Sequence, residues 1–193
     1  MNVTELAPGL WRWTAPHPDW KEGADWERDV GCVYYEAADA TVLIDPLVPP
    51  ERGLFFEALD RDVERRGLPV AILLTCEWHR RSTDELKERY GAGERASDAA
   101  PAGVEPALVL PAMQETLWWL AEERTLVPGD VLLGAPDGLS VCPDSWLEGG
   151  VTPAALRTDL RQLLDLPVER VLVSHGKPVL EGGRAALEHG LGV

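Results

Sequence analysis

The chain has 193 residues, of which 45% are hydrophobic and 26% are charged, as is ordinary for a globular protein with one well-developed core. Its 33 acidic and 18 basic residues give a formal net charge of -15. This charge disfavours nucleic acid and anionic membranes as partners, because both require a basic surface on the protein. The sequence has no apolar run long enough to span a bilayer and no signal-peptide pattern, so we expect a cytoplasmic protein without membrane contact.

The N-terminal half begins with strand patterns. Residues 10–14 alternate between apolar and polar side chains and predict an opening strand. Residues 15–30 are rich in Pro, His and Trp and predict a long loop. Its Trp20 and Trp26 either line a cleft or pack the loop onto the sheet.

A hairpin and a helix follow this loop. Residues 32–36 and 41–45 are rich in β-forming side chains and predict two antiparallel strands. Apolar residues at helical spacing over 51–66, followed by Gly67, predict a helix that ends at this glycine.

The stretch at residues 75–82, Thr-Cys-Glu-Trp-His-Arg-Arg-Ser, carries the strongest chemical signal. It follows a short apolar run at 69–74 that predicts a buried strand. Ser82 and Glu85 form a capping-box pattern, which predicts a helix that ends near Tyr90. Because ligands of α/β sheets bind at the carboxyl ends of strands, we expect the functional site here.

The C-terminal half predicts a second set of strands and helices. The expected elements are a short strand within 91–103, a hairpin (115–120 and 124–127), a strand (131–134), a loop (135–151), a helix that starts at Thr152, a strand (169–174) and a helix (183–189) capped by Gly190. This order predicts two sheets with helices outside, rather than one doubly wound sheet.

Four motifs resemble the metallo-β-lactamase fold superfamily over nearly the whole chain. They are Val-Leu-Ile-Asp at 42–45, the strand-loop-helix at 70–90, Pro-Gly-Asp at 128–130 and Val-Ser-His-Gly at 173–176. The resemblance implies an α+β fold, an αβ/βα four-layer sandwich in which helices flank two mixed β-sheets. It also implies a single domain over residues 1–193.

The family's metal-binding motif, Thr-His-x-His-x-Asp-His, is strongly altered here. Thr75 matches, but the four ligand positions carry Cys76, Trp78, Arg80 and Arg81. A tryptophan offers no lone pair to a metal, and an arginine repels a cation, so only Cys76 can still bind one. The family's third histidine is expected between residues 109 and 115, which contain no histidine.

Two of the family's ligands are matched. Asp130 corresponds to the metal-bridging aspartate and His175 to the last histidine, while Asp45 corresponds to a carboxylate that braces the ligand loop. The resemblance therefore implies a site without the dinuclear centre, and we expect no cofactor. The alternative is one zinc ion held by Cys76, Asp130 and His175, with or without Glu77.

Without a metal, the Asp130 carboxylate needs another positive partner. We predict an ion pair between Asp130 and Arg80 or Arg81; the alternative is that the arginines point to solvent. His79 stands at a variable position of the motif, so we expect a surface or capping role for it.

Two classes of function follow. One is a binding or regulatory module that holds a small anionic or aromatic ligand with Trp78, His79, Arg80 and Arg81 near His175. The other is a hydrolase of ester, thioester or lactam-like bonds, with Cys76, Asp130 and His175 as catalytic residues and either a residual metal or Cys76 as nucleophile.

The oligomeric state is open at this stage. Trp118 and Trp119 on the predicted hairpin fit a homodimer interface as well as a core. The cysteines Cys32, Cys76 and Cys142 are odd in number and widely spaced, which predicts neither a disulfide framework nor a metal-binding CxxC pair.

Overall fold

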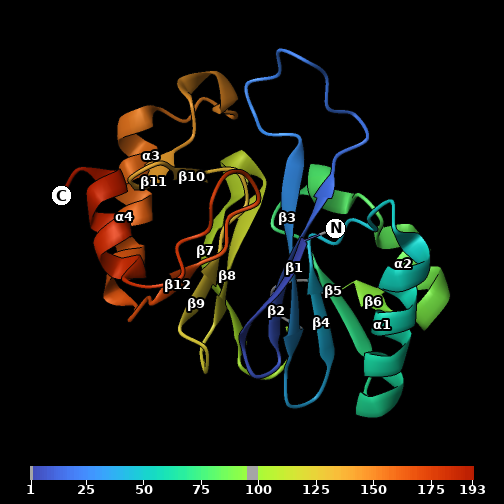
Figure 1. The fold of residues 1–193 in the computed structure, drawn as a ribbon. Helices are drawn as coiled ribbons and strands as arrows, with labels where there is room; N and C mark the ends of the chain where they lie inside the picture. Colours follow the sequence, from blue (N-terminus) through green and yellow to red (C-terminus); the bar gives the residue numbers. More distant parts are fainter. Residues whose placement is uncertain (1, 95–99) are drawn as a thin grey trace. The chain divides into compact units, whose positions relative to one another are not determined.

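The computed structural model describes residues 2–94 and 100–193. Contacts between residues group the chain into two compact units. Unit 1 comprises residues 1–74 and 78–104, and unit 2 comprises residues 75–77 and 105–193. Each unit has its own sheet and its own helices (Figure 1). The single domain predicted over residues 1–193 stays a prediction.

Unit 1 contains a six-stranded mixed sheet in the order β1-β2-β3-β4-β5-β6. Strands β1 to β4 pair antiparallel, whereas β4, β5 and β6 pair parallel. The strands are β1 (Asn2–Ala7), β2 (Leu10–Pro16), β3 (Asp29–Glu36), β4 (Thr41–Ile44), β5 (Val70–Leu73) and β6 (Gly93–Glu94).

Helices α1 (Arg52–Arg66) and α2 (Thr83–Tyr90) pack on one face of this sheet. Phe55 and Leu59 of α1 and Leu86 of α2 join the buried residues of strands β2 to β5 in one hydrophobic core. Gly67 ends α1 in the left-handed conformation, as the sequence predicted.

Unit 2 contains a four-stranded mixed sheet in the order β12-β9-β8-β7 and a separate hairpin, β10-β11. The strands are β7 (Val104–Leu110), β8 (Glu115–Leu120), β9 (Thr125–Val127), β10 (Leu132–Ala135), β11 (Gly138–Val141) and β12 (Arg170–Val171). Helices α3 (Pro153–Leu160) and α4 (Gly183–Leu191) contribute Leu156 and Leu187 to its core, which also buries Trp119. Trp119 therefore packs inside this unit.

The α+β class and the two helix-flanked mixed sheets are confirmed, while several local predictions were wrong. The predicted loop at 135–151 contains β11, and the final strand covers only Arg170–Val171. Helix α4 continues past Gly190 to a cap at Gly192. Gly190 is required for packing instead, because a Cβ there would lie 2.7 Å from the carbonyl oxygen of Leu139. The prediction for residues 91–103 lies partly outside the described residues.

The capping box predicted at Ser82 does not form. Helix α2 starts after Ser82, but this side chain makes no capping hydrogen bond to the helix. Its hydroxyl oxygen accepts a hydrogen bond from the backbone N–H of Val48 at 2.9 Å instead. Ser82 therefore joins the start of α2 to the segment that follows β4. Within the part of the chain that the structure describes, no helix is long and apolar enough to cross a membrane.

Candidate functional site

The loop that follows β5 is divided between the two units. Residues 75–77 belong to unit 2, where the carbonyl of Thr75 accepts a hydrogen bond from the N–H of Thr116 at 2.7 Å. Cys76 forms an isolated antiparallel β-bridge with Glu115, the first residue of β8. Its side chain is buried, and the Thr75 hydroxyl lies 3.8 Å from its sulfur. The backbone of unit 2 thus fixes the position of the Cys76 thiol.

Glu115 is a buried carboxylate held by backbone amides. Its oxygens accept hydrogen bonds from the N–H groups of Gly129 and Asp130 at 3.0 Å and of Val131 at 3.2 Å. A Cβ at Gly129 would lie 2.8 Å from the Thr75 hydroxyl oxygen and from the Glu115 carboxyl carbon, so a side chain cannot fit at this position. Glu115 therefore fixes the loop that carries Asp130.

Asp130 and His175 form a mostly buried pair within unit 2. The Nε2 atom of His175 lies 3.3 Å from Oδ1 of Asp130. The ring of Trp146 contacts the His175 ring edge-on, with 5.9 Å between the centroids. A carboxylate oxygen of Asp130 also lies within 4.8 Å of the Cys76 sulfur. Three residues predicted from the sequence, Cys76, Asp130 and His175, are therefore gathered around Asp130.

Cys142 reports the electrostatics of this region. Burial raises the pKa of its thiol to about 11, and the negative charges of Glu115, Asp130 and Asp144 raise it further in the same direction. A thiol with this pKa stays protonated at neutral pH. The carboxylates of Glu115, Asp130 and Asp144 therefore lie close enough to Cys142 to disfavour its thiolate.

Residues 78–82 belong to unit 1, and here one prediction was wrong. His79 is 3% exposed and not at the surface, and its Nδ1 lies 2.9 Å from Oδ2 of the buried Asp45. The prediction rested on the variable position of His79 in the motif, but residues 77–80 form a 3₁₀ turn, in which three residues complete one turn, and His79 is buried there. Asp45, in the left-handed conformation with φ of 49°, thus braces the loop as the resemblance implied.

The two arginines of the motif differ in their surroundings. The Arg81 guanidinium donates hydrogen bonds to the carbonyls of Gly31 at 3.2 Å and Asp45 at 3.0 Å. Arg80 pairs with the exposed Asp84 at 3.4 Å on the first turn of α2. Trp78 is 44% exposed. The ion pair expected between Arg80 or Arg81 and Asp130 stays a prediction.

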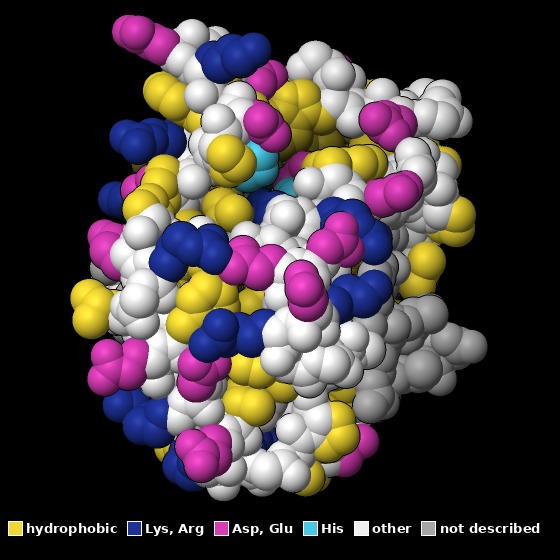
Figure 2. All heavy atoms as spheres, turned by 90° about the vertical axis from the view of Figure 1, so that its right-hand side faces the viewer, with side chains coloured by type: hydrophobic (Ala, Val, Ile, Leu, Met, Phe, Trp, Pro, Cys, Tyr) yellow, Lys and Arg dark blue, Asp and Glu magenta, His cyan; other side chains and the backbone are white. Residues whose placement is uncertain are grey.

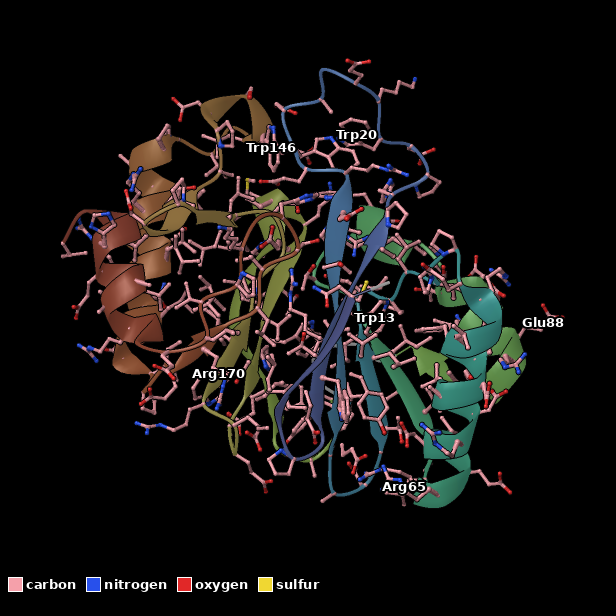
Figure 3. The ribbon with its side chains drawn as sticks, viewed as in Figure 1. Trp13, Trp20, Arg65, Glu88, Trp146 and Arg170 are labelled. Atoms are coloured by element: carbon pink, nitrogen blue, oxygen red, sulfur yellow. The ribbon has the colours of Figure 1, made fainter. Side chains whose placement is uncertain are left out.

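The aromatic residues of the predicted loop at 15–30 both pack and line a cavity. The Trp20 indole N–H donates to the carbonyl of Trp26 at 2.9 Å, and the His17 ring contacts Trp26 edge-on. Trp20 also lines a cavity of about 610 Å³ together with residues 47–50. Trp20, which Figure 3 labels, thus lines a cavity, whereas Trp26 packs against the hydrophobic core of unit 1.

Comparisons with known proteins find similarity in structure only. Neither a family model nor a curated protein sequence matches the chain. A metallo-β-lactamase from Erythrobacter litoralis is similar with a TM-score of 0.62 and 17% identity, over 98% of this chain and 90% of that one. A metallo-β-lactamase from Hirschia baltica is similar with a TM-score of 0.65 and 15% identity, over 98% of this chain and 95% of that one. The metallo-β-lactamase FIM-1 from Pseudomonas aeruginosa, in its mono-zinc form, is similar with a TM-score of 0.63 and 13% identity, over 99% of this chain and 93% of that one.

The chain has the metallo-β-lactamase fold. The low identity means that the similarity concerns the fold and leaves the chemistry of the site to be argued from the residues of this chain. Of the motif positions that resemble metal ligands of this fold, the structure brings Asp130 and His175 into contact and places the Cys76 sulfur within 4.8 Å of an Asp130 oxygen.

Cys76, Asp130 and His175 carry donor types that suit zinc, and the Cys76 sulfur and His175 Nε2 each lie near an oxygen of Asp130. Sulfur, carboxylate oxygen and imidazole nitrogen are all zinc ligands. The 3.3 Å between Nε2 of His175 and Oδ1 of Asp130 is close to the separation, about 3.3 Å, of two ligands on one tetrahedral zinc. The positions that carry Trp78, Arg80 and Arg81 offer no donor for a second cation.

Sequence reasoning missed Glu115. Its partners at 129–131 are distant in the sequence, so no short motif identifies it. One signal was present: Glu115 closes the window in which the family places its third histidine, and it immediately precedes the apolar stretch of β8. An acidic residue next to a buried apolar stretch is itself expected to be buried, and a buried carboxylate needs hydrogen-bond donors around it.

Proposed function

We propose that this chain is a metallo-β-lactamase-fold protein without a dinuclear metal centre, which binds a small anionic or aromatic ligand at the Cys76, Asp130 and His175 cluster. The role of Glu115 is the main support. Its carboxylate oxygens accept three backbone N–H groups of the 129–131 loop, so they are already used for bracing. Glu115, the residue that closes the window for the family's third histidine, thus holds the 129–131 loop in place.

The surroundings of His175 support the ligand class. An imidazole beside a carboxylate can donate a hydrogen bond to an anion when it is protonated. The half-buried Trp146 ring, edge-on to His175, offers an aromatic surface next to this donor (Figure 3). A ligand with one anionic and one flat apolar part, such as a benzoate, would satisfy both. The ligand contacts predicted for Trp78, His79, Arg80 and Arg81 stay a prediction.

A hydrolase of ester, thioester or lactam-like bonds is the second candidate. It is favoured by the short distance between Asp130 and His175 and by the nearby Cys76 sulfur. These three residues would hold a single zinc ion, which when bound supplies a Lewis acid and a water of lowered pKa. Asp130 would orient the His175 ring, and Glu115 would keep Asp130 in place.

The metal content of the protein distinguishes the two candidates. Protein purified without added metal or chelator is analysed by elemental mass spectrometry for zinc, iron and manganese. Less than about a tenth of an equivalent per chain supports the binding module, because a structural or catalytic zinc site binds its ion tightly. About one equivalent, lost in both Asp130→Ala and His175→Ala, overturns the proposal in favour of the hydrolase. Asp144→Ala and His189→Ala change exposed residues and serve as matched controls.

Ligand binding is tested with benzoate. Millimolar benzoate is expected to raise the melting temperature of the native protein, because a ligand that binds only the folded state stabilises it. His175→Ala is expected to lose this increase, whereas His189→Ala keeps it. An equal increase in both variants would place benzoate elsewhere and contradict the proposed site.

A further inference from the structure

A second pocket lies wholly within unit 1, between the sheet and α1. Its volume is about 140 Å³, and its lining includes Trp11, Trp13, Tyr34, Phe55 and Ala58. None of Cys76, Asp130 and His175 belongs to this unit. The pocket is therefore independent of the proposed function.

Strand register explains why aromatic side chains meet here. Trp11 of β2 pairs with Tyr34 of β3, which pairs with Leu43 of β4. Directly paired residues lie on the same face of a sheet, so these three side chains face α1 together. Trp13, two residues after Trp11, is on this face as well and lies 5.5 Å from the Phe55 ring of α1 (Figure 3).

The helix leaves the space open because Ala58 contributes only a methyl group to the wall. Phe55 and Leu59 on either side of it are buried, so α1 is well packed at these positions. The rim reaches the surface, since Val3 is 45% exposed. Figure 2 looks onto the side of α1 and α2, where hydrophobic atoms are visible among the charged side chains.

Two polar groups of the wall are engaged elsewhere. The Trp13 indole N–H donates to the carbonyl of Leu47 at 2.9 Å, and the Tyr34 hydroxyl donates to Glu36 at 3.1 Å. Arg61 and Asp62 at the rim carry opposite charges. The pocket therefore presents apolar surface without a net charge, which suits a neutral molecule better than an ion.

We propose that this pocket binds a neutral apolar molecule of about the size of toluene. An apolar protein cavity of about 150 Å³ binds benzene, and the volume here is nearly the same. The aromatic walls favour a flat ring, which can contact Trp11, Trp13 and Phe55 in offset or edge-on arrangements.

The probe for this proposal is fluorobenzene, followed by ¹⁹F NMR during titration with the full-length protein. Saturable binding to the native chain is expected. Ala58→Phe fills the pocket and is expected to raise the Kd by at least about tenfold, because an apolar ring then occupies the ligand volume. Leu54→Phe adds a ring to the same helix at a position that is 66% exposed, and it is expected to leave the Kd within about twofold.

Circular dichroism melts of all proteins establish that they are folded. If Ala58→Phe does not fold, Ala58→Met narrows the same pocket with a more adaptable side chain. Absence of saturable binding to the native chain, or equal Kd values for native protein and the folded Ala58 variant, overturns the proposal. Tighter binding of fluorobenzoate than of fluorobenzene overturns the assignment of a neutral ligand.

Discussion

The two units use the residues of the altered motif in different ways. In unit 1, His79 and Arg81 bond to Asp45 and to main-chain carbonyls, so their polar groups hold the backbone together. In unit 2, Asp130 and His175 contact each other directly, and Glu115 makes the bonds to the backbone. The two roles are therefore carried by different residues. In unit 1, the polar side chains of the motif hold the backbone in place. In unit 2, Glu115 holds the loop, and the donor atoms of Asp130 face His175.

Removal of the Glu115 brace is expected to have the largest effect on stability. Glu115→Ala leaves three backbone N–H groups without their acceptor and is expected to lower the free energy of unfolding by about 3 kcal/mol or more. Urea denaturation measures this change. Glu122→Ala at an exposed position is the control, with an expected change within about 0.5 kcal/mol. A small effect of Glu115→Ala would show that other contacts fix the Asp130 loop.

The corresponding brace in unit 1 is the His79–Asp45 pair. His79→Ala and Asp45→Ala are each expected to cost about 2–3 kcal/mol, because each leaves a buried polar partner behind. The double variant is expected to cost less than the sum by about 1 kcal/mol or more. Urea unfolding of the four proteins completes the cycle. Additive single effects would mean that the two side chains contribute independently.

Arg81 and Arg80 offer a smaller, matched comparison. Arg81→Met is expected to destabilise the protein by about 1–2 kcal/mol, because the carbonyls of Gly31 and Asp45 lose their donor. Arg80→Met is expected to change stability by no more than about 0.5 kcal/mol, since its ion pair with Asp84 is exposed. Equal effects of the two substitutions would contradict the bracing role of Arg81.

The buried thiols give an effect of a different kind, a pH dependence. Burial raises the pKa of Cys32 in unit 1 and of Cys142 in unit 2 from near 9 to about 11. The folded state therefore retains these protons, so their contribution to stability is complete below pH 9 and is lost as the pH rises through 11. The expected slope approaches about 1.4 kcal/mol per pH unit for each thiol. Urea unfolding at pH 8, 9 and 10 measures it.

Cys32→Ser and Cys142→Ser should each reduce that slope. An unchanged slope in both variants would assign the pH dependence to other groups. Both thiols are also expected to react negligibly with a thiol reagent at pH 7.5, because only about one in three thousand is then ionised. Any rapid labelling of the native protein would therefore report on Cys76.

Elements with a buried face were predictable from the sequence, and edge strands were not. The apolar spacing of α1 and the glycine after it located this helix to within one residue. Strand β1 was missed because most of its residues are exposed and leave little apolar pattern at the edge of its sheet. Strand β7 contains Pro106, which usually argues against a strand but is tolerated at the edge position that β7 occupies.

The proximity of two candidate site residues was predictable from the sequence. Asp130 and His175 followed from matched motif positions, and the structure brings them together. The surroundings of His79 were not predictable from its variable position in the motif, because a 3₁₀ turn changes which side chains point inward. Glu115 was missed because a carboxylate that binds backbone amides leaves no pattern in the residues it contacts.

Residues 75–77 belong to unit 2 although the chain on either side of them belongs to unit 1, and this has a consequence for folding during synthesis on the ribosome. All of unit 1 precedes residue 105, whereas Thr75 and Cys76 pair with Thr116 and Glu115 on β8. Domains fold as they emerge, N-terminal parts first. A nascent chain can therefore form the sheet of unit 1 before β8, to which Thr75 and Cys76 bond, has been synthesised. Cys76 thus reaches its final position only after translation has passed β8.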